Sequence, residues 1–180
     1  MLRVTVFDMP HILLVDDNQT FLYASRELLL QHRPTFVVDV AVDAETALTA
    51  IRTQDYDVVV SDLVLPRLDG IALLYECHQI RPDTPVILIS GYGNLQLEQV
   101  AAERGAYAFL HKPVDPDAFF SVVNRAVLRA AMRRRPQEVL GEDSSWYPQV
   151  VEQADRRPNP IAERLRETIQ SSDPPSTESH

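Results

Sequence analysis

The stretch VVVSDLVLPRLDG at residues 58–70 begins with a continuously apolar, β-branched run and places an acid where that run ends. Four other short apolar runs precede and follow it, and segments of helical length separate all five. Runs of this kind are typical of strands buried on both faces of a parallel sheet. The predicted strands are His11–Val15, Phe36–Val40, Val58–Ser61, Val86–Ser90 and Ala106–Leu110.

The segments between the strands carry apolar residues at helical spacing. One predicted helix face consists of Phe21, Ala24, Leu28 and Leu29, and the next of Ala44, Ala47, Leu48 and Ile51. Further helices are predicted at Gly70–Ile80, Leu95–Glu103 and Pro116–Ala131, the last with Asp115 as its N-cap. Five successive βα units predict an open, doubly wound α/β sheet.

The composition narrows the class of protein. The 180 residues are 45% hydrophobic and carry 26 acids against 17 bases, a net charge of −9. This balance disfavours non-specific nucleic-acid binding, which depends on Lys and Arg. No run approaches the roughly 18 apolar residues that predict a membrane helix. The single cysteine, Cys77, excludes an internal disulfide, and its helical spacing predicts a buried thiol. We expect a soluble, cytoplasmic protein with no membrane contact and no direct DNA binding.

The composition also divides the chain into three segments. We predict a leader at residues 1–9, one folded domain at residues 10–131 and an extension at residues 132–180. The extension holds six of the thirteen prolines and few bulky aliphatic residues. It is therefore predicted to be largely disordered, with a short helix at residues 160–170.

Polar side chains stand where four of the predicted strands end. Asp16 and Asp17 follow the first strand, Asp62 the third and Lys112 the fifth, and Ser90 ends the fourth. Because the carboxyl ends of the strands meet at one edge of the sheet, we expect these side chains to lie together. Two carboxylates about 4 Å apart repel by roughly 4 kcal/mol at an effective dielectric near 20. A divalent cation, Mg²⁺ or Mn²⁺, is therefore predicted among the three acids.

Beside such an ion, Asp62 has the chemistry of a carboxylate nucleophile that forms an aspartyl phosphate. Ser90 supplies a hydroxyl donor and Lys112 a point cation for phosphoryl oxygens. Lys112 is the only lysine in the chain, beside sixteen arginines, which argues against a role as general surface charge.

Four stretches carry a family resemblance: ILLVDD (12–17), VVVSDLVLPRLDG (58–70), VILISGYG (86–93) and GAYAFLHKP (105–113). Over roughly residues 10–129, the chain resembles the receiver domain of two-component response regulators, of the single-domain type with a short C-terminal extension. The resemblance implies a flavodoxin-like fold with five parallel strands in the order 2-1-3-4-5. It also implies that Asp62 is the phosphoacceptor, that Asp16 and Asp17 bind Mg²⁺, and that Lys112 binds the phosphate.

The resemblance implies three further roles. The backbone carbonyl of Val64 joins Asp16, Asp17 and Asp62 as a metal ligand. Ser90 and Phe109 are the hydroxyl and aromatic residues of a conformational switch, Phe109 being three residues before the lysine. The two histidines near these motifs, His78 and His111, are interpreted as structural or surface residues.

The leading functional hypothesis is a response regulator rather than an enzyme. A sensor histidine kinase or phosphotransfer protein donates a phosphoryl group to Asp62 with Mg²⁺, and the domain assists its own phosphotransfer and dephosphorylation. The output is contact with a downstream protein or a phosphorylation-dependent homodimer. Alternatives are a phosphorelay intermediate and a transcription-linked regulator that acts through a partner.

A further alternative is a Mg²⁺-dependent phosphatase of the haloacid dehalogenase type, which also uses an aspartate nucleophile. That family places its nucleophile in a D-x-D pattern after the first strand. Here Asp16 and Asp17 are followed by Asn18 and Gln19, so the pattern is absent and the phosphatase is disfavoured.

Overall fold

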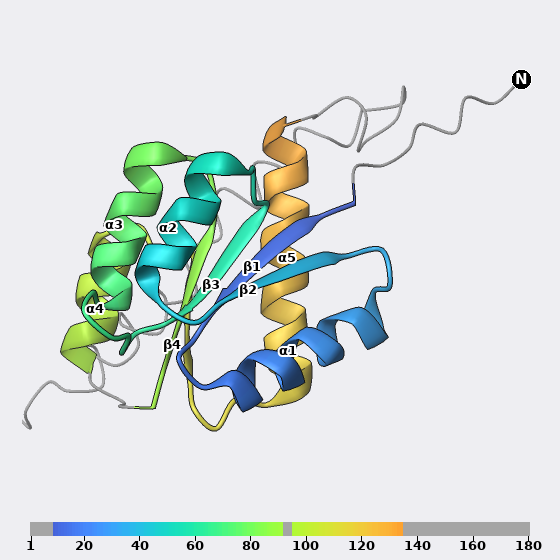
Figure 1. The fold of residues 1–180 in the computed structure, drawn as a ribbon, viewed down its shortest axis with the longest axis horizontal. Coiled ribbons are helices and arrows are strands. Elements are labelled where there is room, and N and C mark those ends of the chain that lie inside the picture. The colour runs from blue at the N-terminus through green and yellow to red at the C-terminus, as the bar shows by residue number, and fades with distance from the viewer. Residues whose placement is uncertain (1–8, 92–94, 135–180) are drawn as a thin grey trace, which may run out of the picture.

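The computed structural model describes residues 9–91 and 95–134, in which strands and helices alternate (Figure 1). In chain order the elements are β1 (His11–Val15), α1 (Gln19–His32), β2 (Val37–Ala41), α2 (Ala44–Thr53), β3 (Val58–Asp62), α3 (Gly70–Ile80), β4 (Val86–Ser90), α4 (Leu95–Glu103), β5 (Ala108–His111) and α5 (Pro116–Arg134). The leader up to residue 8, and the extension from residue 135 with its predicted helix, lie outside the described residues.

The five strands form one parallel sheet in the order β2-β1-β3-β4-β5. The predicted flavodoxin-like, doubly wound α/β fold is therefore confirmed. The chain order reverses between β1 and β3, which pair with each other in the middle of the sheet. Open α/β sheets bind their ligands at such a reversal, outside the carboxyl ends of the strands.

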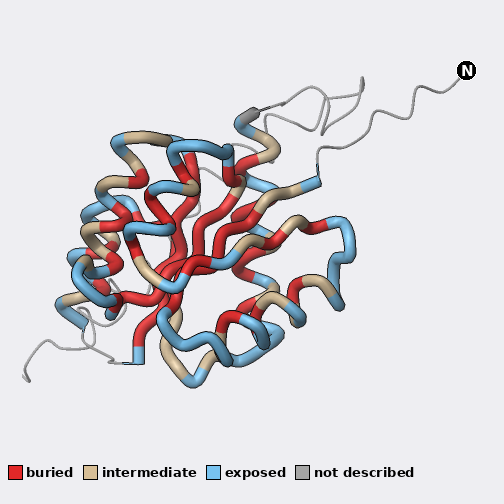
Figure 2. Tube along the Cα trace, viewed as in Figure 1, coloured by how far each residue is buried: buried red, intermediate tan, exposed pale blue. Residues whose placement is uncertain are grey.

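Helices cover both faces of the sheet, with α1 and α5 on one face and α2, α3 and α4 on the other (Figure 1). Each face has its own apolar cluster, because successive strand residues point to opposite sides. The cluster under α2, α3 and α4 includes Leu13, Val59, Leu88 and Phe109. The cluster under α1 and α5 includes Ile12, Val58, Ile87 and Phe119. Buried residues accordingly run along the strands, while the outer helix faces are exposed (Figure 2).

Short polar side chains begin the helices that lead away from the carboxyl ends of the strands. The side chains of Asn18, Asp43, Asp69 and Asp115 each accept a hydrogen bond from the backbone N–H three residues on, at 2.7–3.1 Å. The predicted N-cap at Asp115 is therefore confirmed. Caps of this kind stabilise a helix by about 0.5–2 kcal/mol relative to alanine.

Several predicted boundaries are wrong by one to three residues. The second strand is Val37–Ala41 instead of Phe36–Val40, the fifth is Ala108–His111 instead of Ala106–Leu110, and α5 ends at Arg134 instead of Ala131. The buried face of α1 is also rotated: it consists of Leu22, Ser25 and Leu29, while Ala24 is exposed.

Two other predictions about the helices are confirmed. The face predicted for α2 is buried at all four of its positions. Cys77 is fully buried in α3, and this burial raises the pKa of its thiol to about 12. Within residues 9–91 and 95–134, no helix combines the length and the apolar character needed to cross a membrane.

Candidate functional site

The carboxyl edge of the sheet brings the predicted acids and the lysine together. Asp16 directly follows β1, Asp62 ends β3 and Lys112 directly follows β5. Backbone hydrogen bonds fix these positions, because the N–H of Asp16 donates to the carbonyl of Ala41 at 3.1 Å and that of Lys112 to the carbonyl of Ser90 at 2.7 Å. The sheet itself therefore holds both sides of the site.

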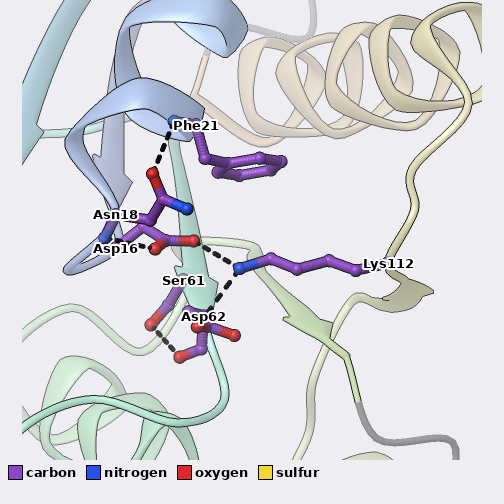
Figure 3. Close-up of polar contacts among 6 residues, drawn as sticks. All are labelled: Asp16, Asn18, Phe21, Ser61, Asp62 and Lys112. Carbon is purple, nitrogen blue, oxygen red and sulfur yellow. Dashed lines mark hydrogen bonds and ion pairs between the residues drawn. The ribbon is translucent and has the colours of Figure 1, made fainter.

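The ammonium of Lys112 lies between two buried carboxylates (Figure 3). Its Nζ atom is 2.7 Å from Asp16 Oδ2 and 3.2 Å from Asp62 Oδ2. Asp16 is 1% exposed and Asp62 8%, whereas a quarter of the Lys112 side chain reaches solvent. Buried charges need such partners, since leaving one unpaired costs several kcal/mol.

Asp17 completes a group of three carboxylates whose oxygens lie within 4.8 Å of one another. Three carboxylates and one ammonium leave a formal charge of −2 when all are ionised. One Mg²⁺ ion matches that charge and takes oxygen ligands from one or two carboxylates while keeping several waters. Asp17 is exposed, so the group is open to solvent on its side. The donor set therefore fits the predicted divalent ion.

The pKa values of Asp62 and Lys112 are shifted by the groups around them. Burial raises the pKa of Asp62, and the charge of Asp16 adds to this, while Lys112 and the backbone N–H of Val64 act in the opposite direction. For Lys112, burial by itself lowers the pKa, but the hydrogen bonds and charges of Asp16 and Asp62 raise it above 10.5 overall. Near neutral pH the lysine therefore stays charged and opposes the repulsion between the two acids.

The other predicted site residues lie around this group. Ser90 is fully buried at the end of β4, in register with His111. Phe109 is 6% exposed, belongs to the cluster under α2, α3 and α4, and has its ring 5.4 Å from that of His111. Val64 is more than half exposed in the loop after β3. The structure thus brings Asp16, Asp17, Asp62 and Lys112 together and places Phe109 in the core.

Hydrogen bonds and close backbone packing hold the loop after β3 near Asp62. The Gly70 N–H donates to the Leu63 carbonyl at 2.8 Å, and the Ser61 hydroxyl donates to the Asp62 carbonyl at 2.8 Å. A Cβ atom on Gly70 would overlap the Asp62 carbonyl oxygen and lie 2.9 Å from Leu63 Cα. Only glycine therefore fits where α3 begins.

We expect Gly70→Ala to lower the free energy of unfolding by about 1–3 kcal/mol, because the added methyl group must displace backbone rather than a flexible side chain. Denaturant unfolding measures this effect. Gly91→Ala is the matched control, since a Cβ there meets nothing within 4 Å. Equal stabilities for the two variants would contradict the close packing at Gly70.

Sequence reasoning missed three contributors to the site's surroundings. Asn18 links Asp16 to α1, and the ring of Phe21 lies against Lys112. His111 pairs with the nearly buried carboxylate of Glu98, Nε2 to Oε1 at 2.6 Å, and so joins β5 to α4. The available signal for this last pair was an acid on a predicted helix, Glu98, together with a histidine, His111, directly after the next predicted strand.

The family model described as the response regulator receiver domain matches residues 12–124. The chain therefore belongs to the receiver domain family of two-component response regulators. Among curated proteins, it is 30% identical over 162 residues to the C4-dicarboxylate transport transcriptional regulatory protein DctD of Rhizobium meliloti, covering 89% of this chain and 34% of that protein. The chain spans about a third of the length of the first curated relatives it matches.

Solved structures agree with this assignment. The signal receiver domain of an HD domain-containing protein from Pseudomonas fluorescens is 33% identical, with a TM-score of 0.68, and the match covers 76% of this chain and all of that one. The receiver domain of NtrX from Brucella abortus is 37% identical, with a TM-score of 0.61, covering 65% of this chain and 98% of that one. The similarity thus spans the whole receiver fold.

Proposed function

We propose that this chain acts as a phosphoacceptor in a two-component or phosphorelay pathway, with Asp62 as the acceptor. The donor is a sensor histidine kinase or a phosphotransfer protein. The observation that carries the proposal is the ammonium of Lys112 between Asp16 and Asp62, beside the exposed Asp17. This arrangement gives one carboxylate nucleophile a fixed cation on one side and a site for a divalent ion on the other.

In the transfer step, a carboxylate oxygen of Asp62 attacks phosphorus and the bond from phosphorus to the donor's imidazole nitrogen breaks, with its electron pair returning to the ring. Lys112 already donates toward Asp62 and is placed to follow the negative charge onto the phosphoryl oxygens. Asp16 holds that ammonium from the opposite side at 2.7 Å. Such preorganised charge is the main contribution a protein makes to phosphoryl transfer.

Asp16, Asp17 and Asp62 are the residues that would hold Mg²⁺, and the proposal includes the backbone carbonyl of Val64 as a further ligand. When bound, the ion supplies positive charge for phosphoryl oxygens. Of the three acids, Asp16 already has a partner for each oxygen: Oδ1 accepts the Asn18 N–H and Oδ2 accepts from Lys112. Asp17 is therefore the acid most available to coordinate the ion.

The proposed output is a contact with a downstream protein or with a second phosphorylated copy. Ser90 and Phe109 form the switch in this proposal, since Ser90 is buried beside the acceptor strand and Phe109 lies on the neighbouring strand. Phosphorylation replaces the single negative charge of the Asp62 carboxylate with a phosphoryl group that carries about −1.5 to −2 charges. The proposal includes no direct DNA contact because the chain has 26 acids and 17 bases. A phosphorelay intermediate uses the same site chemistry.

We expect incubation with a small acyl phosphate and Mg²⁺ to add one base-labile phosphoryl group to the wild type and none to Asp62→Asn. Intact-mass spectrometry before and after mild base measures this. Asp69→Asn is the matched control, because its amide can still cap α3 and the residue lies outside the carboxylate group. Labelling of Asp62→Asn to the wild-type level would refute the assignment of the acceptor.

A further inference from the structure

The aromatic ring of Phe21 lies against the ammonium group of Lys112 (Figure 3). The Lys112 Nζ atom is 4.6 Å from the ring centroid, within the range of about 6 Å in which a cation is attracted to an aromatic face. The two residues come from different parts of the fold, since Phe21 is in the first turn of α1 and Lys112 follows β5. The contact therefore joins the beginning of α1 to Lys112, whose ammonium faces Asp62.

One carboxylate fixes both partners of this contact. Asp16 Oδ2 accepts from Lys112 at 2.7 Å, while Asp16 Oδ1 accepts the backbone N–H of Asn18 at 2.8 Å. The Asn18 side chain in turn accepts the backbone N–H of Phe21 at 3.1 Å and caps α1. The position of the ring is thus tied to the same acid that holds the ammonium.

The ring and the acids together limit where the ammonium can move. A lysine ammonium has three N–H donors, and two of its directions are taken by Asp16 and Asp62. The ring of Phe21 covers another side of the group. Because lysine has a flexible four-carbon stem, a neighbour that restricts it reduces the freedom lost when the ammonium engages a phosphoryl group.

We propose that Phe21 is a positioning residue, whose aromatic face holds the Lys112 ammonium where it meets a phosphoryl group on Asp62. The inference rests on the proposed function and adds a residue to that site. Removing the aromatic face while keeping an apolar side chain should weaken binding of a phosphoryl mimic about three- to tenfold, the range that partly desolvated cation–aromatic contacts support.

The test uses the fact that Lys112 is the only lysine in the chain. Labelling with ¹³C-lysine therefore gives a single ε-methylene signal, and the shielding of that signal reports the aromatic ring directly. Phe21→Leu should shift the signal downfield and weaken binding of beryllofluoride with Mg²⁺, measured by ¹⁹F NMR titration. Phe21→Tyr, which keeps the aromatic face, should restore both the shift and the affinity.

Phe120→Leu is the matched control. Phe120 packs against the same apolar cluster as Phe21, but its ring stacks on His32 at the other end of α1, at 4.5 Å between centroids. This variant should leave both the lysine signal and the beryllofluoride affinity unchanged. Equal losses in Phe21→Leu and Phe120→Leu would show that Phe21 acts only through packing, and so would overturn the proposal.

The two proposals fail in different ways. If the wild type binds beryllofluoride and Phe21→Leu binds it equally well, only the role of Phe21 is wrong. If the wild type itself binds no beryllofluoride in the presence of Mg²⁺, the proposed function is wrong, whatever the lysine signal shows.

Discussion

Replacing Lys112 with methionine is expected to lower the free energy of unfolding by about 2–3 kcal/mol in the absence of divalent ions. The change leaves Asp16 and Asp62 buried side by side without the ammonium that now lies 2.7 and 3.2 Å from them. Breaking a fully buried ion pair from one side costs about 3–5 kcal/mol, and we expect less here because a quarter of the Lys112 side chain is exposed. Denaturant unfolding in EDTA measures the loss.

The loss should depend on pH and on Mg²⁺. Because burial and Asp16 already raise the pKa of Asp62, removing Lys112 raises it further, and the folded state then takes up a proton at higher pH than the unfolded chain. The destabilisation is therefore largest above that raised pKa and decreases as the pH falls through it. Mg²⁺ should stabilise Lys112→Met more than the wild type, because the ion replaces the missing charge.

Arg133→Met is the control for losing a cation from the surface. Arg133 pairs with Asp83 at 3.1 Å, with 44% and 84% of the two side chains exposed. Such a pair contributes only about 0–1 kcal/mol. If Lys112→Met were no more costly than Arg133→Met, the two buried acids would not depend on Lys112.

Asp17→Ala is expected to remove the stabilisation that Mg²⁺ gives the folded domain. For the wild type, that stabilisation is about 2.7 kcal/mol at a hundredfold excess of ion over its Kd. Without the ion, the variant should be at least as stable as the wild type, since one of three mutually repelling carboxylates is gone and both Lys112 ion pairs remain. Thermal unfolding with Mg²⁺ and with EDTA measures both effects.

Asp117→Ala serves as the control for Asp17→Ala. Asp117 is an exposed acid in the first turn of α5 and lies outside the carboxylate group. This variant should keep the full Mg²⁺ shift. An undiminished shift in Asp17→Ala would exclude Asp17 as a ligand of the ion.

The fold was predictable because its strands are short, apolar and buried on both faces. Two of the boundary errors have identifiable causes. At β5, the N–H of Ala106 donates to the carbonyl of Ala101 at 2.9 Å, so this apolar residue closes the end of α4 before the strand begins. At α5, Arg133 reaches Asp83 across the fold, and such a tertiary contact leaves no signal in the periodicity of the helix.

The candidate site was predictable to the extent that topology alone assembles it. Asp16, Asp62 and Lys112 stand directly at strand ends, and a parallel sheet brings those ends to one edge. Phe21 was assigned to an apolar helix face, and it does pack against the core under α1 and α5. Its contact with Lys112 depends on how α1 is rotated about its axis, and the predicted rotation was off by about one residue.

The ion pair between Lys112 and Asp16 also bears on how the domain is synthesised. The two residues are 96 positions apart in the chain. At about 5–20 residues per second on the ribosome, Lys112 is made about 5–20 s after Asp16. During that time the chain carries Asp16 and Asp62 without Lys112, because Lys112 follows β5, the last of the five strands to be made. A nascent chain that stops before β5 therefore contains Asp16 and Asp62 but not the ammonium that lies between them in the folded domain.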